Sequence, residues 1–504
     1  TELALVRVMR RQYDQSTKLP EEFVTSFSHL TSRALSVWTH ARRRSDFSLF
    51  APLLEEVVAM CRRQAEYLGY PEEPYDALLD LHEEGLTTSM VVKMFAGLRE
   101  PLRDMVRKLR TVGGRELRFA EPFRQEEQIA FAEKMLAAIG FDFKRGRQDL
   151  SAHPFTTSIG HHDHRVTNRY HPHSLEFIFS ALHEGGHALY EQNIADSLEG
   201  TALDSGISLG VHESQSRLWE NVIGRSLPFW EHFYPELRQA FPAQFADLPL
   251  SEFVSGLNLV RPGPIRVEAD EVSYNLHVLI RFELEKALID GTLAVRDLPA
   301  AWDQRYREDL DVRVDRDADG VLQDIHWSHG SFGYFPTYTI GNLAAAQIWE
   351  AYRGFDSETE KTLRRGELAK IRNWLTERIY RHGSIYPPGE LIVNVTGKPL
   401  DAEGVLQDIH WSHGSFGYFP TYTIGNLAAA QIWEAYRGFD HEAETTLRRG
   451  KLAKIRSWLT EQIYRHGSIY LPKELIVNVT GKPLGAKPFL GYLGKKFQVG
   501  EFVA

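Results

Sequence analysis

The chain has 504 residues, of which 43% are apolar and 25% are charged, a typical globular composition from which a sizeable core can form. This length suits one large domain or two to three ordinary ones. The net charge of −10 argues against a nucleic-acid-binding surface, which needs a basic footprint, and no apolar run reaches the ~18 residues that a membrane-spanning helix needs.

The chain contains one cysteine, Cys61, so an intramolecular disulfide is impossible and a reducing compartment fits best. Cys61 lies in VVAMCRRQAEYL, an amphipathic helical stretch, and we interpret it as a core or surface residue rather than a nucleophile. The first residues, TELALVRVMRRQYD, show neither the apolar region nor the cleavage site of a secretory signal. We therefore expect a cytoplasmic protein.

Residues 1–140 are predicted to be helical. Stretches such as FVTSFSHLTSRALSVWTHARR and LFAPLLEEVVAMCRRQAEYLG carry apolar residues three and four positions apart, with charged residues between them. The motif PEEP at 71–74 and the stretch TVGGRE at 111–116 interrupt the pattern and predict breaks between helices.

The character of the sequence changes at residues 150–170. The stretch HPFTTSIGHHDHRVTNRY is rich in Thr and poor in helix formers, and it predicts a strand or hairpin. Helical patterns resume in HSLEFIFSALHEGGHALYEQ, SLGVHESQSRLWENVIGRSL and EVSYNLHVLIRFELEKALIDG. We therefore predict a mainly α-helical protein with a small β element.

The C-terminal part contains a near-perfect tandem repeat. The stretch Asp317–Leu400 recurs as Asp401–Leu484, and the segment GVLQDIHWSHGSFGYFPTYTIGNLAAAQIWEAYRGFD occurs twice without a change. Two copies do not make a solenoid, which usually needs three or more. Near-identity favours a recent duplication or an assembly artefact over an old structural repeat.

The motif HEGGH at 183–187 lies in a helical pattern with an apolar flank. Histidines four positions apart lie one above the other on a helix, so His183 and His187 can bind the same metal ion. Glu184 is placed to accept a proton from an attacking water. Gly185 and Gly186 each cost ~1 kcal/mol of helix propensity, and their missing side chains would let a substrate backbone approach the helix.

A catalytic zinc site needs a third protein ligand and an open position. Glu213, in the stretch SLGVHESQSRLWENVIG, follows His187 after a short connection, and its Leu, Val and Trp flank predicts a mostly buried helix. We therefore favour Glu213 as the third ligand over a solvated surface residue. His212 beside it is either an outer partner of the site or a packed residue.

Five sequence blocks resemble the signature motifs of the carboxypeptidase Taq family, a group of HExxH metallocarboxypeptidases. They are DHRVT at 163–167, HEGGH at 183–187, HESQS at 212–216, IRVEAD at 265–270 and GVLQDIHW at 320–327. Five motifs in the family's order and spacing are far more specific than HExxH alone. The resemblance covers most of the chain from about residue 70 onward.

The resemblance implies a helical fold with a long deep groove, a homodimer, zinc or cobalt as the metal, and broad release of C-terminal residues from peptide substrates. It implies His183, His187 and Glu213 as metal ligands and Glu184 as general base. It also implies a substrate groove lined by Asp163, Arg165, Thr167, Arg266, Gln323 and His326.

General chemistry suggests roles for several of these residues. A carboxypeptidase must bind a free C-terminal carboxylate, which the two-pronged fork of a guanidinium does best. Arg266 and Arg165 are the candidates for this clamp. His326 and Tyr338 are placed to donate hydrogen bonds to the developing oxyanion beside the metal.

Other conspicuous residues receive no chemical role. We interpret Trp327 and Phe335 as packing residues. His161, His162 and His164 are interpreted as groove or surface residues rather than a second metal site, because side chains on a β-like segment point to alternate faces.

The chain departs from the family pattern in two ways. Family members usually carry a further helical segment, which helps to roof the groove, ahead of the region that matches residues 1–70, and we expect it to be missing here. The GxxQDxHW block also occurs twice. The first copy lies at the family-like distance from HEGGH, so we assign His326 rather than His410 to the site, while use of the second copy stays open.

We divide the chain into an N-terminal helical region (1–140), a catalytic region (141–400), and residues 401–504, which comprise a near-duplicate of 317–400 and a C-terminal tail. The predicted function is metallocarboxypeptidase activity, with Glu184 passing a proton from the attacking water to the leaving amine. A metallo-endopeptidase, a helical binding protein that has lost catalysis, and a protein with an accidental motif are the alternatives.

Overall fold

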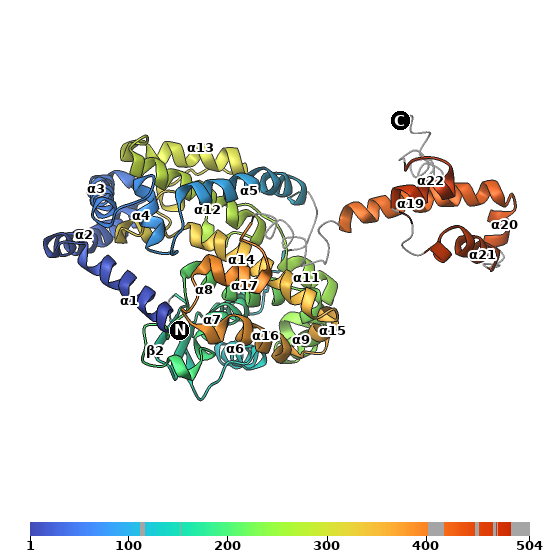
Figure 1. Cartoon of the computed structure of the whole chain (residues 1–504), viewed down its shortest axis with the longest axis horizontal. Helices are drawn as coiled ribbons and strands as arrows, with labels where there is room; N and C mark the ends of the chain where they lie inside the picture. The colour runs from blue at the N-terminus through green and yellow to red at the C-terminus, as the bar shows by residue number, and fades with distance from the viewer. Residues whose placement is uncertain are drawn as a thin grey trace. The chain divides into compact units, whose positions relative to one another are not determined.

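The computed structural model describes residues 1–110, 116–151, 153–401, 418–448, 453–466, 470 and 472–484. The chain forms two compact units, Thr1–His413 and Gly414–Ala504, both built mainly from helices (Figure 1). Residues 1–140 and 141–400 belong to the same unit. Among the described helices, none combines the length and the apolar character needed to cross a membrane.

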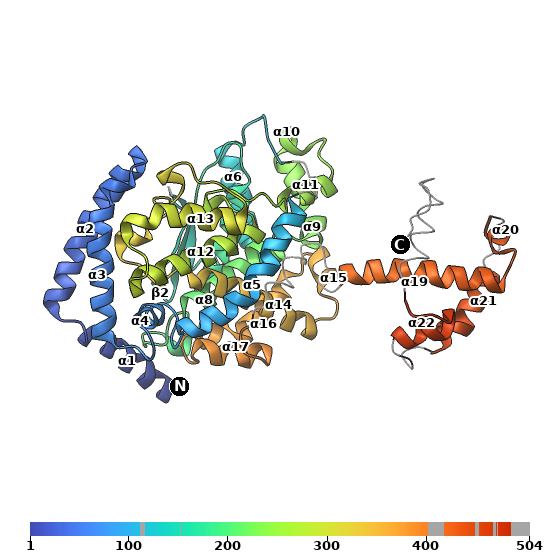
Figure 2. The same cartoon turned by 90° about the horizontal axis from the view of Figure 1, so that it is seen from above.

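Six α-helices lie in the described N-terminal part of the first unit, and α2 and α3 lie side by side (Figure 2). The PEEP motif ends in Pro74, the first residue of α4, where its fixed φ suits a helix start. Of the second predicted break, residues 111–115 lie outside the described residues. The helices are α1 (Glu2–Thr17), α2 (Glu21–Arg44), α3 (Ala51–Leu68), α4 (Pro74–Asp80), α5 (Thr88–Leu109) and α6 (Gln125–Ile139).

The predicted β element is a three-stranded sheet with the order β1-β3-β2. Strands β2 (Thr156–Gly160) and β3 (Asp163–Asn168) form the expected antiparallel hairpin. Strand β1 (Gly146–Leu150), which the sequence did not indicate, pairs with β3 in parallel. Strands β2 and β3 both pack against helix α7 (Glu176–Gln192), so the sheet lies beside the HEGGH motif.

Two helices pack against α7, and a third packs along one of them. Helix α6 and helix α8 (Leu209–Arg217) pack against α7, and α14 (Pro336–Phe355) packs along α8. Helix α8 continues into the π-helical segment η3 (Leu218–Ile223). Single π-helical turns are rare and frequently mark functional sites. The other described α-helices of this unit are α9 (Leu227–Ala240), α10 (Pro242–Phe245), α11 (Leu250–Leu257), α12 (Glu271–Asp290), α13 (Leu298–Leu310), α15 (Thr359–Arg364), α16 (Leu368–Arg378) and α17 (Pro388–Thr396).

The apolar flank of HEGGH belongs to a large hydrophobic cluster that α6, α7, α9, α14 and α16 share. Burial of this much apolar surface is the main force that holds these helices together. Trp327 and Phe335 are each 1% exposed, which confirms the packing role predicted for them. Cys61 is also buried, in α3.

The start of α8 is fixed by two polar side chains. The Ser208 hydroxyl accepts a hydrogen bond from the amide of Val211, as an N-cap does, at 3.1 Å. The Glu83 carboxylate accepts from the amide of Gly210 and from the Ser208 hydroxyl, each at 2.9 Å. A carboxylate at a helix N-terminus is favourable, yet burial raises the pKa of Glu83 to about 7.

Where it is described, the second unit repeats helices of the segment 336–399. Its helices are α19 (Tyr418–Phe439), α20 (Ala443–Arg448), α21 (Ala453–Gln462) and α22 (Pro472–Thr480). In the first copy Gln347 Nε2 donates to Thr396 Oγ1 at 2.8 Å, and in the second copy Gln431 Nε2 donates to Thr480 Oγ1 at 2.9 Å. The packing differs, because Tyr380 is buried whereas its equivalent, Tyr464, is 60% exposed.

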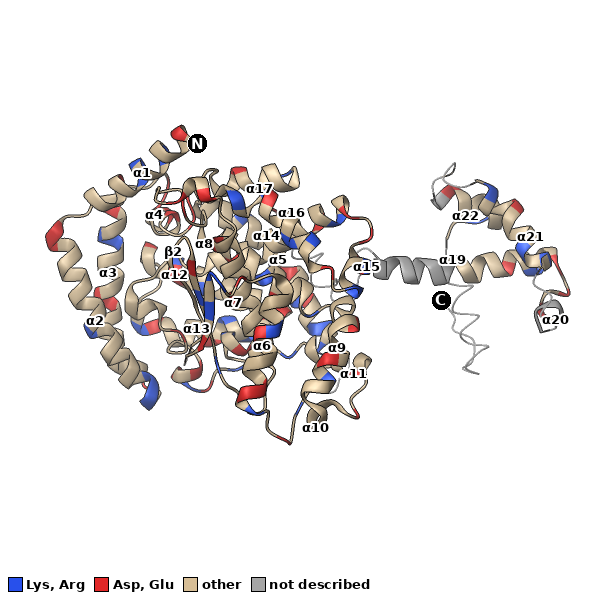
Figure 3. Ribbon diagram, turned by 90° about the horizontal axis from the view of Figure 1, so that it is seen from below, with Lys and Arg blue, Asp and Glu red and all other residues tan. Residues whose placement is uncertain are grey.

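Acidic and basic residues are interspersed on the described helices of both units (Figure 3). This mixed pattern agrees with the modest net charge and gives many short ion pairs between neighbouring turns, such as Arg10–Asp14 and Lys370–Glu367. Exposed pairs of this kind each contribute little to stability.

Candidate active site

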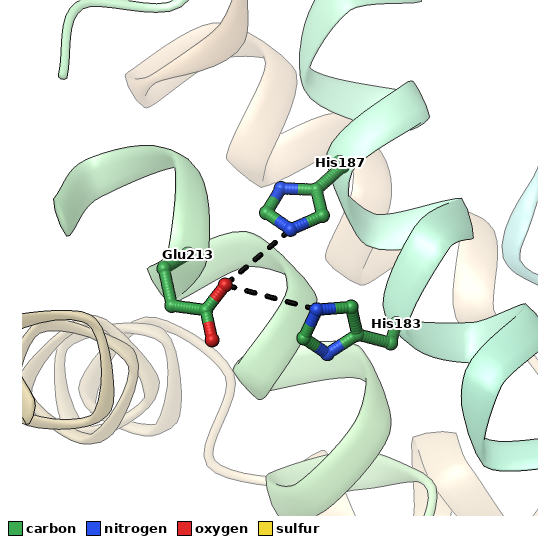
Figure 4. Close-up of side chains that lie close together, drawn as sticks. All are labelled: His183, His187 and Glu213. Carbon is green, nitrogen blue, oxygen red and sulfur yellow. Dashed lines mark ion pairs between the residues drawn. The ribbon is translucent and has the colours of Figure 1, made fainter. Parts of the chain in front are cut away.

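Helix α7 carries the HEGGH motif, and α8 carries Glu213 beside it (Figure 4). The imidazoles of His183 and His187 project from α7 toward the Glu213 carboxylate. Their donor atoms all lie within 4.8 Å of one another, the arrangement that a metal ion needs. Glu213 Oε2 lies 3.7 Å from His183 Nε2 and 3.4 Å from His187 Nε2.

These separations fit a metal ion. Bonds of about 2.1 Å at tetrahedral angles hold two donor atoms about 3.4 Å apart. Two imidazoles and one carboxylate are also the donor set of a common class of catalytic zinc site, which leaves one position for water or substrate.

Each of the three side chains has its second polar atom engaged by a different partner. His183 Nδ1 lies 2.8 Å from Glu220 Oε2, and His187 Nδ1 lies 2.6 Å from His212 Nδ1. Arg217 Nε donates to Glu213 Oε1 at 2.7 Å. One donor atom of each residue therefore remains directed at the common centre.

The charges around this centre favour a cation. Burial opposes a charge on His183, but the carboxylates of Glu213, Glu220 and Glu184 outweigh it and raise its pKa to about 9. Burial lowers the pKa of His187. Although burial works against ionisation of Glu213, Arg217 and the two histidines hold its pKa well below the usual range.

Gly185 and Gly186 serve helix packing, which corrects the prediction that they admit a substrate backbone. A Cβ atom on Gly186 would stand 2.5 Å from the carbonyl oxygen of Gln215 and 2.7 Å from Cα of Ser216, both in α8. A Cβ on Gly185 would meet the side-chain ends of Leu136 and Ile139 in α6 at 2.7 Å. Only glycine allows the close approach of α7 to α8 that brings the ligands together.

The sheet reaches the site through Thr156 of β2. Its hydroxyl lies 2.6 Å from Glu184 Oε2 and 2.9 Å from the Glu184 carbonyl oxygen. Glu184 is 7% exposed, so this contact fixes one oxygen of a largely buried carboxylate. The sequence could not reveal this partner, because Thr156 and Glu184 are distant in the chain.

Arg266 is buried in an internal ion pair and does not present a free guanidinium. Its Nη2 and Nε donate to the two oxygens of Asp324 at 2.7 and 3.2 Å, and its Nη1 donates to Tyr274 at 2.9 Å. Gln323 accepts from the Arg266 amide and donates to the carbonyl of Pro264, at 2.8 and 2.9 Å. The motifs IRVEAD and GVLQDIHW are thus bound to each other, and Asp324 occupies the guanidinium fork of Arg266.

The DHRVT motif occupies β3. Arg165 is partly exposed and donates from Nη2 and Nε to the two oxygens of Asp163, at 2.6 and 2.9 Å. Residue Thr167 is buried, and its hydroxyl contacts Ser151 at 2.7 Å. Arg165 pairs with Thr157 across the hairpin, next to the residue that contacts Glu184.

Tyr338 lies on the side of α14 that faces Glu213, and His326 lies in the preceding short helical segment η7 (His326–His329). Gly341 touches Glu213 so closely that a Cβ there would be 2.6 Å from Glu213 Cγ, and Tyr338 lies one turn earlier on the same face. The rings of His326 and Tyr338 both pack on Phe335, with centroid distances of 4.9 and 5.5 Å. Burial, assisted by nearby arginines, lowers the pKa of His326 to about 3, so its imidazole is neutral.

Two of the three clustered histidines are buried, which corrects their interpretation as groove or surface residues. His161 lies between Asp204 and Asp196, at 2.6 and 3.0 Å. His164 is 2% exposed and contacts the Ser158 hydroxyl at 2.9 Å. His161 thus fixes the turn between β2 and β3 to the segment that follows α7, whereas His164 holds the hairpin together.

Comparison with known proteins decides the family. Residues 1–403 match the model of the carboxypeptidase Taq (M32) metallopeptidases, and residues 398–497 match it again. Carboxypeptidase 1 of Bacillus subtilis is 41% identical over 404 residues, covering 80% of this chain and 81% of that protein. The chain belongs to the carboxypeptidase Taq family.

Further carboxypeptidase Taq relatives agree in sequence and in fold. Thermostable carboxypeptidase 1 of Pyrococcus furiosus is 42% identical over 409 residues, again covering 80% of this chain and 81% of that protein. The crystal structure of an M32 carboxypeptidase from Deinococcus radiodurans superimposes with a TM-score of 0.80 at 40% identity, covering 82% of this chain and 84% of that one. The second match of the family model reflects the tandem repeat.

The carboxypeptidase Taq site contains residues that the sequence reading missed. Glu220 and Arg217 follow Glu213 by two turns and one turn, so helical periodicity places them on its face of α8 and η3. That spacing is a signal that could have revealed both. Tyr334, whose ring lies 5.4 Å from that of Tyr338, had no comparable signal.

Proposed function

We propose that this chain is a zinc-dependent metallocarboxypeptidase of broad specificity, in which Glu184 is the general base. The observation that carries the proposal is the convergence of His183 Nε2, His187 Nε2 and Glu213 Oε2 beside Glu184. The donor set favours zinc, and cobalt is a suitable substitute because it accepts the same ligands and geometry.

A zinc ion bound there would lower the pKa of a coordinated water and polarise the scissile carbonyl. Glu184 accepts the proton of the attacking water and delivers it to the leaving amine. Thr156 restrains one carboxylate oxygen of Glu184 at 2.6 Å. The buried setting limits competing water around Glu184.

Tyr338 and His326 are proposed to stabilise the oxyanion. Burial keeps the pKa of Tyr338 well above its usual range, so its hydroxyl stays protonated and can donate. The neutral imidazole of His326 can likewise donate from one ring nitrogen. Preorganised donors of this kind act where negative charge develops.

Arg165 is proposed as the clamp for the substrate's terminal carboxylate, and Asp163 and Thr167 are proposed as further residues of the substrate groove. The guanidinium of Arg165 is partly exposed, and so is the carboxylate of Asp163, with which it forms an ion pair. An exposed ion pair is weak, so a substrate carboxylate can replace Asp163 at low cost. Arg266 and Gln323 instead join the motifs IRVEAD and GVLQDIHW. A cytoplasmic homodimer acting on peptides completes the proposal.

The function is tested by mass spectrometry on a peptide with a free C-terminus and on its C-terminal amide, each incubated with zinc- or cobalt-loaded protein. We expect stepwise loss of C-terminal residues from the free acid alone. Internal cleavage of both peptides would indicate a metallo-endopeptidase. Bound metal without any cleavage would indicate a helical binding protein.

A further inference from the structure

A chain of polar contacts leads from His187 to the end of α7. His187 Nδ1 lies 2.6 Å from His212 Nδ1, and His212 Nε2 lies 2.8 Å from Glu191 Oε1. The same Glu191 oxygen accepts the amide hydrogen of Gly206 at 2.9 Å. Both ring nitrogens of His212 are therefore engaged, one on each side.

The positions of the protons in this series of contacts follow from its two terminal residues, His187 and Glu191. His187 must present an unprotonated Nε2 to a metal, so its proton resides on Nδ1 and is donated to His212 Nδ1. His212 Nδ1 is then the acceptor, and its own proton lies on Nε2. That proton is donated to Glu191, a carboxylate that can only accept.

The His212 ring is confined as well as hydrogen-bonded. The Tyr190 ring lies 5.2 Å from it, and a Cβ on Gly206 would stand 2.7 Å from His212 Cδ2. The ring therefore cannot turn away from His187 without moving the segment between α7 and α8. His183 is supported differently, because Glu220 contacts its Nδ1 directly.

We infer that His212 and Glu191 are positioning residues that fix the tautomer and the orientation of His187 for metal binding. The inference rests on the proposed metal site. The two histidine ligands thus have different partners. His183 contacts the carboxylate of Glu220 directly, whereas His187 contacts the imidazole of His212, which in turn contacts the carboxylate of Glu191. Outer partners of this kind typically change metal affinity by about 10–100-fold.

Two substitutions distinguish this role from simple packing. His212→Phe keeps a ring of similar size but removes the acceptor. His212→Asn loses the ring but can place its amide oxygen where Nδ1 was. If His212 positions His187, zinc affinity falls about 10–100-fold in His212→Phe and is partly restored in His212→Asn. If His212 only fills space, His212→Phe resembles the wild type and His212→Asn is the weaker binder.

The measurements are zinc dissociation constants by competition with a chromogenic chelator, the visible spectrum of the Co²⁺-loaded proteins, and thermal melting of each metal-free variant. We expect an altered cobalt spectrum in His212→Phe. Should that variant not fold, a second pair of substitutions tests Glu191, the last residue in this series of contacts. Glu191→Leu removes the acceptor for His212, whereas Glu191→Gln keeps one. We then expect zinc affinity to be lower in Glu191→Leu than in Glu191→Gln. Equal affinities in either pair would overturn the inference.

The readouts separate this inference from the proposed function. Wild-type protein that binds zinc but cleaves no peptide would refute the function and leave the positioning role to be decided by the affinities. Wild-type protein that binds no zinc would refute both.

Discussion

Gly186 of α7 and Gln215 of α8 are in backbone contact: a Cβ on Gly186 would lie 2.5 Å from the Gln215 carbonyl oxygen. This contact sets the distance between the helix that carries the two histidines and the helix that carries Glu213. The metal site is therefore a product of helix packing as much as of ligand identity.

Gly186→Ala is expected to separate α7 from α8. The new methyl group meets backbone atoms, which cannot rotate away, so we expect a loss of ~1–3 kcal/mol of stability and weaker zinc binding. Gly185→Ala is the matched control, because its methyl meets only the side-chain ends of Leu136 and Ile139. Thermal melting and zinc titration of both variants check this. An unchanged melting temperature with a raised KM in Gly186→Ala would restore the substrate-approach hypothesis.

Much of the site was predictable, because its signals are local. The HEGGH spacing identifies His183 and His187, and the buried helical flank of HES supports Glu213. Helix content and the β2–β3 hairpin follow from periodicity and composition in the same way. These features depend on residues within a few turns of one another.

The features that sequence could not supply depend on distant contacts. Nothing near Arg266 indicates that Asp324 fills its fork, and nothing near Glu184 indicates Thr156. His161 is exposed or buried according to where Asp196 and Asp204 lie, which only the fold decides. Residue His410 of the second copy lies outside the described residues, so its alternative role stays a prediction.

Arg266→Met is expected to destabilise the protein rather than to weaken substrate binding. It leaves buried Asp324 with only the more distant Arg281, at 4.0 Å, and breaking a buried pair costs about 3–5 kcal/mol. The double variant Arg266→Met/Asp324→Leu should recover part of that loss. Denaturant unfolding of the single and double variants measures both values. A stable Arg266→Met protein with a raised KM for free-acid peptides would instead make Arg266 the clamp.

The two copies of the GxxQDxHW block can be separated by a matched pair of substitutions. His326→Ala should lower kcat by about 10²-fold with zinc content unchanged, because it removes a donor to the oxyanion. His410→Ala should leave kcat at the wild-type value. Steady-state kinetics on one free-acid peptide compares them. The reverse result would assign the site to the second copy.

His161 makes a pH-dependent contribution to stability. Burial opposes its charged form, but Asp196 and Asp204 outweigh burial, so the pKa of His161 is raised in the folded protein. The contribution is therefore fully present below the ordinary histidine pKa of ~6.5 and is lost as pH rises through the raised folded value. The difference in melting temperature between wild type and His161→Asn should be larger at pH 6 than at pH 9. The same difference at both pH values would contradict this ion-pair account.

The most direct measurement combines zinc content with kcat for Glu184→Gln. A glutamine of the same shape keeps the neighbours of Glu184 but cannot accept the proton, so the account predicts one zinc per chain, as in the wild type, and a kcat lowered by about 10²–10⁴-fold. A variant that binds zinc and hydrolyses free-acid peptides at the wild-type rate would contradict Glu184 as the general base.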